Sequence, residues 1–298
     1  MSGQSLAWMD GKIIPLEDAK IGVTDLGLTH SDITYDVVQV WDGAFFRLQD
    51  HLDRFLQSMK IMHLAVPQSR ADMQGILQSL AGASGFRDAY CAFVTSRGPQ
   101  LVPGSRDPRT CVNHFYAWIV PYVHVVSQDV VARGTRMKIA DGIARISPES
   151  IDPTAKNYHW GDLTNGLFQA LEEGFDTVVL ADDNGNVCEG PGFNVFSVKD
   201  GVVLTARTGV LEGITRKSVL EICEQLKIPL EVRDVPVAEF LASDEVFITS
   251  SGGGPMPVTH VNDRIYSNGV EGPITLRIRE LYLNWRANGP LRTAIKYG

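Results

Sequence analysis

The chain has 298 residues, 44% of them hydrophobic and 21% charged, which is typical of a globular protein long enough for two domains. Its formal net charge of −8 and isoelectric point near 5.4 argue against a nucleic-acid-binding protein, because phosphate contacts need a basic surface. The sequence has no signal peptide, no apolar run of the ~20 residues that a membrane helix needs, and no paired cysteines. We therefore expect a cytoplasmic protein with free thiols that binds no nucleic acid, membrane or metal.

The first half of the chain contains hairpin, helix and strand patterns. Asp10-Gly11 and Asp42-Gly43 lie between short apolar or alternating runs, which indicates type I′ turns between paired strands. An apolar stripe that begins near Asp50 predicts one helix, and a second helix is expected over 70–82. The strands expected here are 35–41, 44–48, 89–96 and 112–120.

Residues 121–133 are interpreted as a connection between two halves, although their valines would also suit a strand. Beyond them we expect strands at 137–140, 177–181 and 245–249, helices near 163–173, 215–226 and 274–287, and hairpins at Asn184-Gly185 and Asp200-Gly201. The pattern predicts a mixed α/β chain with much antiparallel sheet. The predicted domains are 1–121 and 134–298, joined by 122–133.

Two residues could carry chemistry on an aromatic carbonyl compound. Lys156 lies among small, aromatic and amide residues, and a lysine amine that is desolvated becomes a nucleophile toward carbonyl groups. Glu189 lies among glycines, which allow a carboxylate to approach a flat ring and hold a pyridine nitrogen protonated. Taken alone, each position is better explained by a simpler interpretation, a solvated loop lysine for Lys156 and an ordinary turn glutamate for Glu189.

Three further segments could bind an anion such as phosphate. The turn at 211–217 opens a helix, whose first N–H groups can hold phosphate, although a capped helix start is the simpler interpretation. The glycine-rich turn at 250–254 offers hydroxyl and N–H groups. Arg54 falls between the apolar positions of its helix and is either a surface arginine or a phosphate ligand. A serine hydrolase is disfavoured because the chain has no G-x-S-x-G segment.

The order and spacing of these segments resemble the fold-type IV enzymes that depend on pyridoxal 5′-phosphate (PLP), the group of branched-chain and D-amino-acid aminotransferases. The resemblance extends from about Trp8 to Leu283 and rests on HLDRF, AKNYHWGDL, NGNVCEGPGFNVFSVKDGVV, GVLEGITRKSV, SDEVFITSS and EGPIT. THSDITYDVVQVWDGAFFRLQDHLDRF and IDPTAKNYHWGDL are most similar to the (R)-selective amine transaminases within that group. It implies a smaller N-terminal α/β lobe, a larger C-terminal lobe with a pseudo-barrel, and a homodimer.

The resemblance also implies roles for single residues. Lys156 would form the Schiff base with PLP, and Glu189 would bind the ring nitrogen. The other residues expected to contact the cofactor are Arg54, Phe193, Asn194, Ile214, Thr215, Ser250 and Ser251. Those expected to line the substrate pocket are His30, Tyr35, Val37, Tyr90, Ala92, Arg106, Trp160 and Gly252. Gly252 departs from the Thr-Thr-Ala-Gly-Gly pattern of relatives and is expected to loosen its loop, and Ala92 replaces a glutamate of some relatives.

The implied reaction is a ping-pong transamination in which Lys156 acts as general base and acid. After Ser96-Arg97-Gly98 the chain lacks the R-x-H pair of D-amino-acid aminotransferases, and Tyr35-Asp36-Val37 replaces the Tyr-Glu-Gly of branched-chain enzymes. We therefore predict an (R)-configured primary amine as donor and a 2-oxo acid such as pyruvate as acceptor. Arg106 either swings in to bind the oxo acid or is a solvated loop residue.

Other functions stay open on the sequence alone. A D-amino-acid or branched-chain amino-acid aminotransferase is the main alternative. A 4-amino-4-deoxychorismate lyase uses the same scaffold for elimination. A ligand-binding protein without catalytic activity is the remaining class.

Overall fold

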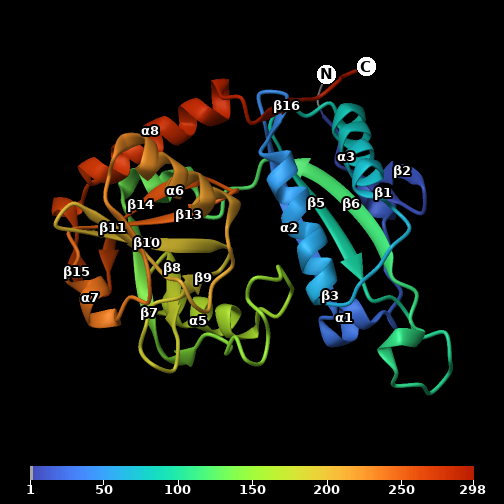
Figure 1. Ribbon diagram of the computed structural model, residues 1–298, viewed down its shortest axis with the longest axis horizontal. Coiled ribbons are helices and arrows are strands. Elements are labelled where there is room, and N and C mark those ends of the chain that lie inside the picture. The colour runs from blue at the N-terminus through green and yellow to red at the C-terminus, as the bar shows by residue number, and fades with distance from the viewer. Residues whose placement is uncertain (1–2) are drawn as a thin grey trace. The chain divides into compact units, whose positions relative to one another are not determined.

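The computed structural model describes residues 3–298, which form two compact units that are not continuous in sequence (Figure 1). Unit 1 contains the chain up to Val123, the segment Ala155–His159 and the residues from Arg286 onward. Unit 2 contains His124–Thr154 and Trp160–Trp285 and is the larger of the two. The segment that carries Lys156 is thus grouped with unit 1. The predicted domain boundaries stay a prediction.

Unit 1 is built on a seven-stranded sheet with the order β16-β4-β3-β5-β6-β1-β2, in which every neighbouring pair is antiparallel. Its strands are β1 (Leu6–Met9), β2 (Lys12–Pro15), β3 (Ile33–Trp41), β4 (Ala44–Phe46), β5 (Ala89–Ser96), β6 (His114–Pro121) and β16 (Arg292–Ala294). Its helices are α1 (Leu26–His30), α2 (Leu48–Ile61) and α3 (Arg70–Ser84), with 3-10 turns at Leu16–Asp18 and Pro108–Thr110. The strands and both long helices predicted for this half are confirmed, with ends shifted by a few residues.

The unit 1 sheet has two different faces because side chains alternate along each strand. On one face Val38 and Phe93 pack into a core that α2 and α3 complete, and Figure 1 shows α2 lying along β3 and β5. The predicted apolar stripe of α2 is buried in this core, with Leu52 and Phe55 fully enclosed. The opposite face carries a separate cluster of aromatic and aliphatic side chains.

The predicted type I′ turns are confirmed at three of the four expected hairpins. Asp10-Gly11, Asp42-Gly43 and Asp200-Gly201 each have positive φ at both residues, as this turn requires. At Asn184-Gly185 only the glycine has a positive φ, of 77°. There the Asp182 carboxylate accepts hydrogen bonds from the N–H groups on either side of Gly185. A side chain therefore shapes that turn, which the dipeptide alone does not reveal.

Unit 2 contains a nine-stranded sheet with five helices around it. Its strands are β7 (Thr135–Ala144), β8 (Thr177–Ala181), β9 (Glu189–Gly190), β10 (Phe193–Lys199), β11 (Val202–Thr205), β12 (Leu230–Val232), β13 (Glu245–Ser250), β14 (Gly254–Val261) and β15 (Arg264–Ile265). The helices are α4 (Gln128–Arg133), α5 (Gly161–Glu172), α6 (Ile214–Leu226), α7 (Val237–Leu241) and α8 (Pro273–Asn288), and a 3-10 turn spans Ser267–Gly269. Helix α8 ends in residues that are grouped with unit 1.

The alternative that the valines of 121–133 form a strand was wrong for the second half of this segment, which forms α4, and its role as a connection stays a prediction. Ser127 caps this helix by accepting a hydrogen bond from the Val130 N–H at 3.4 Å. Valine fits a strand better than a helix in isolation, but a cap and packing against β7 and β14 outweigh that small preference.

Strand pairing in unit 2 curls the sheet back upon itself. The order runs β10-β13-β14-β7-β8, and the residues just before β9 then pair with β8 through Val187 and Ala181. β9 in turn pairs with β10, since Glu189 lies opposite Asn194. The pairing thus returns to its starting strand, and the inward side chains of these strands form the main core of the unit. This curled sheet is the pseudo-barrel that we expected in the C-terminal half.

Candidate functional site

The backbone of Lys156 is held against strand β3 in unit 1. On this edge of β3, β4 covers only the last residues of the strand. The segment around Lys156 pairs with the first half of β3, where Asn157 lies opposite Thr34. The Lys156 carbonyl accepts hydrogen bonds from Thr34 Oγ1 at 2.7 Å and from the Tyr35 N–H at 3.1 Å. Its N–H donates to Ser58 Oγ on α2 at 3.1 Å. Three hydrogen bonds therefore fix the position of this lysine.

The side chain of Lys156 lies against aromatic rings of its own unit. Its Nζ is 4.3 Å from the centroid of the Tyr35 ring, where the ring face attracts a cation. The Tyr158 ring lies 4.4 Å from the Tyr35 ring, and burial raises the pKa of the Tyr158 hydroxyl far above its usual value. Lys156 is therefore half-buried beside the phenol rings of Tyr35 and Tyr158. It is not the solvated loop lysine that the local sequence also allowed.

Four of the predicted substrate-binding residues lie on one face of the unit 1 sheet, opposite α2 and α3. They are Tyr35, Val37, Tyr90 and Ala92, which alternate along the paired strands β3 and β5. Tyr116 and Trp118 of β6 lie on the same face, and Trp118 stacks on Tyr90 with ring centroids 5.7 Å apart. Sequence reasoning missed these two, although they alternate along a predicted strand. The face is apolar and aromatic.

The other two predicted substrate residues of unit 1 are exposed. His30 ends α1, and its Nδ1 lies 2.7 Å from Thr29 Oγ1. Arg106 lies in the loop between Pro103 and Pro108, and its side chain is exposed. Neither joins the aromatic face in this structure.

Arg54 belongs to a buried charge cluster, so the surface interpretation of this arginine was wrong. Its side chain is 11% exposed and makes two hydrogen bonds of 2.8 Å to the buried carboxylate of Asp36. His51 Nδ1 lies 2.8 Å from the same carboxylate. Burial alone would raise the pKa of Asp36, but the charge of Arg54 and the contacts of His51 hold it well below its usual range. Burial lowers the pKa of His51, so its ring is neutral at pH 7.

Glu189 is the centre of a second buried charge cluster, in unit 2. The Glu189 Oε1 atom accepts hydrogen bonds from Arg145 Nε at 3.2 Å and Nη2 at 3.1 Å. Its Oε2 accepts the Leu211 N–H at 3.0 Å. Arg145 Nη1 also donates to Asp162 Oδ2 at 2.6 Å. Sequence reasoning missed Arg145 and Asp162, because no local signal distinguishes them from solvated charges.

The start of helix α6 offers unpaired backbone donors next to Asn194. The cap residue Gly213 makes no side-chain cap hydrogen bond. Asn194 Nδ2 donates to the Leu211 carbonyl at 2.8 Å, and a Cβ atom on Gly213 would lie 2.1 Å from Asn194 Oδ1. A side chain at position 213 would therefore displace the Asn194 amide. Ile214 and Thr215, both buried, follow directly, so the predicted phosphate-binding turn has the backbone geometry of an anion site.

The turn between β13 and β14 is held more firmly than its glycines suggested. The Gly252 N–H donates to Ser250 Oγ at 3.2 Å, and the Gly252 carbonyl accepts the Val125 N–H at 2.8 Å. The expectation of a loosened loop was wrong at this residue. Ser251 is half-buried in the same turn. Phe193, at the start of β10, is buried close to Gly190, where an added Cβ would lie 2.2 Å from its ring.

Trp160 precedes α5, and its ring lies 3.6 Å from where a Cβ on Gly192 would stand. This places Trp160 beside the glycine-rich segment that follows Glu189, within unit 2. Apart from Trp160, which is the N-cap residue of α5, the residues predicted to act in unit 2 belong to the segments around Glu189, the start of α6 and the β13–β14 turn.

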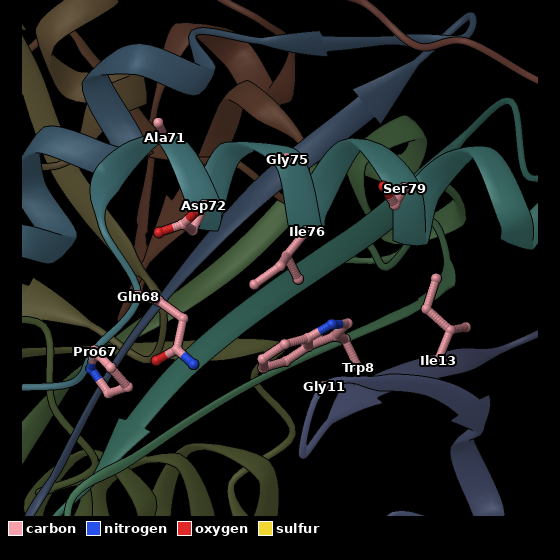
Figure 2. A pocket seen from close by; sticks show the side chains of 10 residues that line it. All are labelled: Trp8, Gly11, Ile13, Pro67, Gln68, Ala71, Asp72, Gly75, Ile76 and Ser79. Atoms are coloured by element: carbon pink, nitrogen blue, oxygen red, sulfur yellow. The ribbon is translucent and has the colours of Figure 1, made fainter.

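A surface groove of about 640 Å³ lies elsewhere in unit 1, between α3 and the β1–β2 hairpin (Figure 2). None of the predicted site residues lines it. The lining residues are Trp8, Gly11, Ile13, Pro67, Gln68, Ala71, Asp72, Gly75, Ile76 and Ser79. Between residues 3 and 298, no helix is both long and apolar enough to cross a membrane. Over the same residues, no cluster of three or more His, Cys, Asp or Glu side chains could hold a metal ion.

A family model described as amino-transferase class IV matches residues 34–261. A protein of Methanocaldococcus jannaschii assigned to the branched-chain-amino-acid aminotransferases is 28% identical over 282 residues, covering 94% of this chain and 96% of that protein. A D-alanine aminotransferase of Listeria monocytogenes is 23% identical over 305 residues, covering 96% of this chain and 98% of the other.

Solved structures resemble the chain over almost its whole length. The T.th. branched-chain amino acid aminotransferase complexed with N-(5′-phosphopyridoxyl)-L-glutamate gives a TM-score of 0.89 at 26% identity, with 99% of both chains covered. The same enzyme with pyridoxamine 5′-phosphate gives a TM-score of 0.91 at 25% identity, again with 99% of both chains covered. The fold class expected from the sequence, mixed α/β with a pseudo-barrel, is confirmed.

Proposed function

Because the chain belongs to the class IV aminotransferases, we propose that it is a PLP-dependent transaminase that moves an amino group from an (R)-configured primary amine to a 2-oxo acid such as pyruvate. Lys156 is the residue to which the cofactor is attached, and Glu189 is its ring-nitrogen partner. The observation that carries the proposal is the placement of Lys156, whose backbone makes three hydrogen bonds and whose amine lies over the ring of Tyr35.

The residues present fit this cofactor. The start of α6 combines N–H donors that no side chain caps with a glycine that lies close to Asn194, which suits a phosphate group. The buried carboxylate of Glu189, fixed by Arg145 and the Leu211 N–H, suits a cationic ring nitrogen. Arg54, Ile214, Thr215, Ser250 and Ser251 would hold the phosphate, and Phe193 and Asn194 would lie near the ring.

The protein residues have separate tasks in the reaction. PLP, when bound, supplies an aromatic ring that spreads negative charge away from the substrate carbon. Lys156 Nζ would take the proton from that carbon as general base and, as general acid, deliver it to the cofactor rather than back to the same carbon. Glu189 keeps the ring nitrogen protonated, which favours the charge spreading. The Tyr158 and Tyr90 hydroxyls keep their protons at neutral pH, because burial raises their pKa, and so remain hydrogen-bond donors.

The aromatic face of unit 1 supports an apolar or aromatic amine as donor. Its members Tyr35, Val37, Tyr90 and Ala92 present rings and methyl groups, which bind an aryl or alkyl substituent well. His30, Trp160 and Gly252 are the other residues proposed to contact the substrate. A transferring enzyme must also bind the carboxylate of a 2-oxo acid, and we assign that task to Arg106. Arg106→Ala should raise the KM for pyruvate about tenfold or more with little change for the amine, and an unchanged KM for pyruvate would disprove this assignment.

A branched-chain or D-amino-acid aminotransferase is the second candidate, favoured by the names of the relatives. A donor panel against pyruvate separates the two: (R)-1-phenylethylamine, its (S) form, D-alanine and L-leucine. The proposal predicts alanine formation fastest with the (R)-amine. Fast turnover of L-leucine alone, or of D-alanine alone, would establish the second candidate, and no alanine from any donor would favour a lyase. We also propose a homodimer, which sedimentation of the purified protein tests.

A further inference from the structure

Arg145 lies between two buried carboxylates that come from different parts of unit 2. Arg145 follows β7, Asp162 lies in the first turn of α5, and Glu189 forms part of β9. Their side chains are 10%, 8% and 9% exposed. One edge of the guanidinium donates twice to Glu189 and Nη1 donates to Asp162. The Asp162 carboxylate also accepts the N–H groups of Ile146 and Leu163, each at 2.8 Å.

This cluster has one positive and two negative formal charges. Two further groups that interact with Glu189 are Arg216 on α6, which is buried, and Cys188 beside it. Glu212 in turn offsets the charge of Arg216. Burial raises the pKa of Cys188 to about 12, so this thiol is neutral at pH 7. With every carboxylate ionised, these groups sum to one negative charge, which a protonated ring nitrogen would neutralise.

We infer that Arg145 is a positioning residue that keeps Glu189 ionised and correctly aimed, and that Asp162 limits this effect by sharing the same guanidinium. A cation at hydrogen-bond distance stabilises the ionised form of a carboxyl group, and a nearby carboxylate opposes it. The inference rests on the proposed function, because it concerns the residue proposed to hold the ring nitrogen. Arg145 and Asp162 would then control the pH range in which Glu189 can act, although neither is proposed to contact substrate or cofactor.

The two single substitutions should act in opposite directions. Arg145→Gln removes the cation, so the pKa of Glu189 rises and protonation begins at higher pH. Asp162→Asn removes a like charge and leaves Arg145 entirely to Glu189, so the pKa of Glu189 falls. The acid limb of kcat/KM against pH should therefore move up by about one pH unit in Arg145→Gln, and down in Asp162→Asn. Arg145→Lys, which keeps the charge, should restore most of the wild-type limb.

Cofactor affinity gives a readout that does not depend on turnover. Equilibrium ultrafiltration of the holoenzymes across a pH series measures the dissociation constant of PLP. At pH values low enough to protonate Glu189, Arg145→Gln should bind PLP about tenfold more weakly than wild type at the same pH, equivalent to one unit of pKa shift. Its affinity should also begin to fall at a higher pH than that of the wild type, and that of Asp162→Asn at a lower pH.

A merely structural role predicts a different pattern. If Arg145 only ties β7, α5 and β9 together, both variants lower the unfolding midpoint while their acid limbs coincide with that of the wild type, and the inference is overturned. Shifts in the same direction overturn it equally. If wild-type protein itself binds no PLP, the proposed function fails instead, so the two failures are distinguishable.

Discussion

In unit 1 Arg54 pairs with one carboxylate, Asp36, beside a neutral His51, whereas in unit 2 Arg145 is shared by two carboxylates, Glu189 and Asp162. The first cluster is balanced, and the second has a surplus negative charge. Both are buried, and such burial is tolerated only where each charge has partners. A balanced cluster fixes an arginine for a further anionic contact. A cluster with a surplus carboxylate is suited to a cation. The two units thus present opposite electrostatic preferences with the same residue types.

The largest effect is expected when Lys156, the residue proposed to react with the cofactor, is removed. Lys156→Ala should lower kcat/KM about 10⁴-fold, because general acid–base assistance from its Nζ is lost. Both buried charge clusters are left intact, so the unfolding midpoint in urea should hardly change. Lys12→Ala on β2, at an exposed position, is the matched control and should keep full activity. A Lys156→Ala enzyme with wild-type rates would refute the role of this lysine.

Breaking the balanced cluster should cost more stability than any surface pair. Asp36→Asn takes from the Arg54 guanidinium the buried carboxylate to which it makes two hydrogen bonds, which should lower the free energy of unfolding by about 3–5 kcal/mol in urea titrations. Asp53→Asn, on the same helix as Arg54, breaks an exposed pair with Arg70 and should cost less than about 1 kcal/mol. If the free energy of unfolding fell equally in the two variants, the buried Asp36–Arg54 pair would stabilise the fold no more than the exposed pair does.

The same isosteric change in unit 2 should cost less. Asp162→Asn still leaves Glu189 to pair with Arg145, so we expect a loss of about 1–3 kcal/mol from the disturbed hydrogen bonds alone. The difference between Asp36→Asn and Asp162→Asn measures what the second carboxylate contributes. A larger loss in Asp162→Asn would reverse the comparison.

The smallest effect concerns pH and His51. Its folded pKa lies below the value of 6.5 for an unperturbed histidine, so the unfolded chain binds a proton that the folded chain does not. Stability should therefore fall as pH drops below about 6.5, by at most about 1.4 kcal/mol per pH unit from this one group. His51→Gln should reduce the loss of urea stability between pH 7 and pH 5. His30→Gln, at an exposed position, should not, and an identical pH dependence in all three proteins would contradict the neutral, buried His51.

Local patterns in the sequence predicted much of the fold. The Asp-Gly turns and the stripe of α2 depend on short-range geometry, so a few adjacent residues suffice to identify them. The helix α4 was missed because its valines suit a strand and only the Ser127 cap and tertiary packing decide the outcome.

The site was predictable only through ordered motifs. Lys156 and Glu189 have bland local surroundings, and their proposed roles come from resemblance. Asp36, the partner of Arg54, and Arg145, the partner of Glu189, could not be singled out, because a charged residue looks the same in sequence whether it is solvated or paired in the interior. Which charges are buried depends on contacts between distant segments, such as Arg145 with Glu189, 44 positions apart.

Reduction of the holoenzyme with borohydride followed by peptide mass spectrometry tests the central claim most directly. Reduction makes the link between cofactor and protein permanent, so the labelled peptide identifies the attachment residue. The account predicts one phosphopyridoxyl group, carried by Lys156. A label on another lysine, or no label on a protein that has bound PLP, would contradict it.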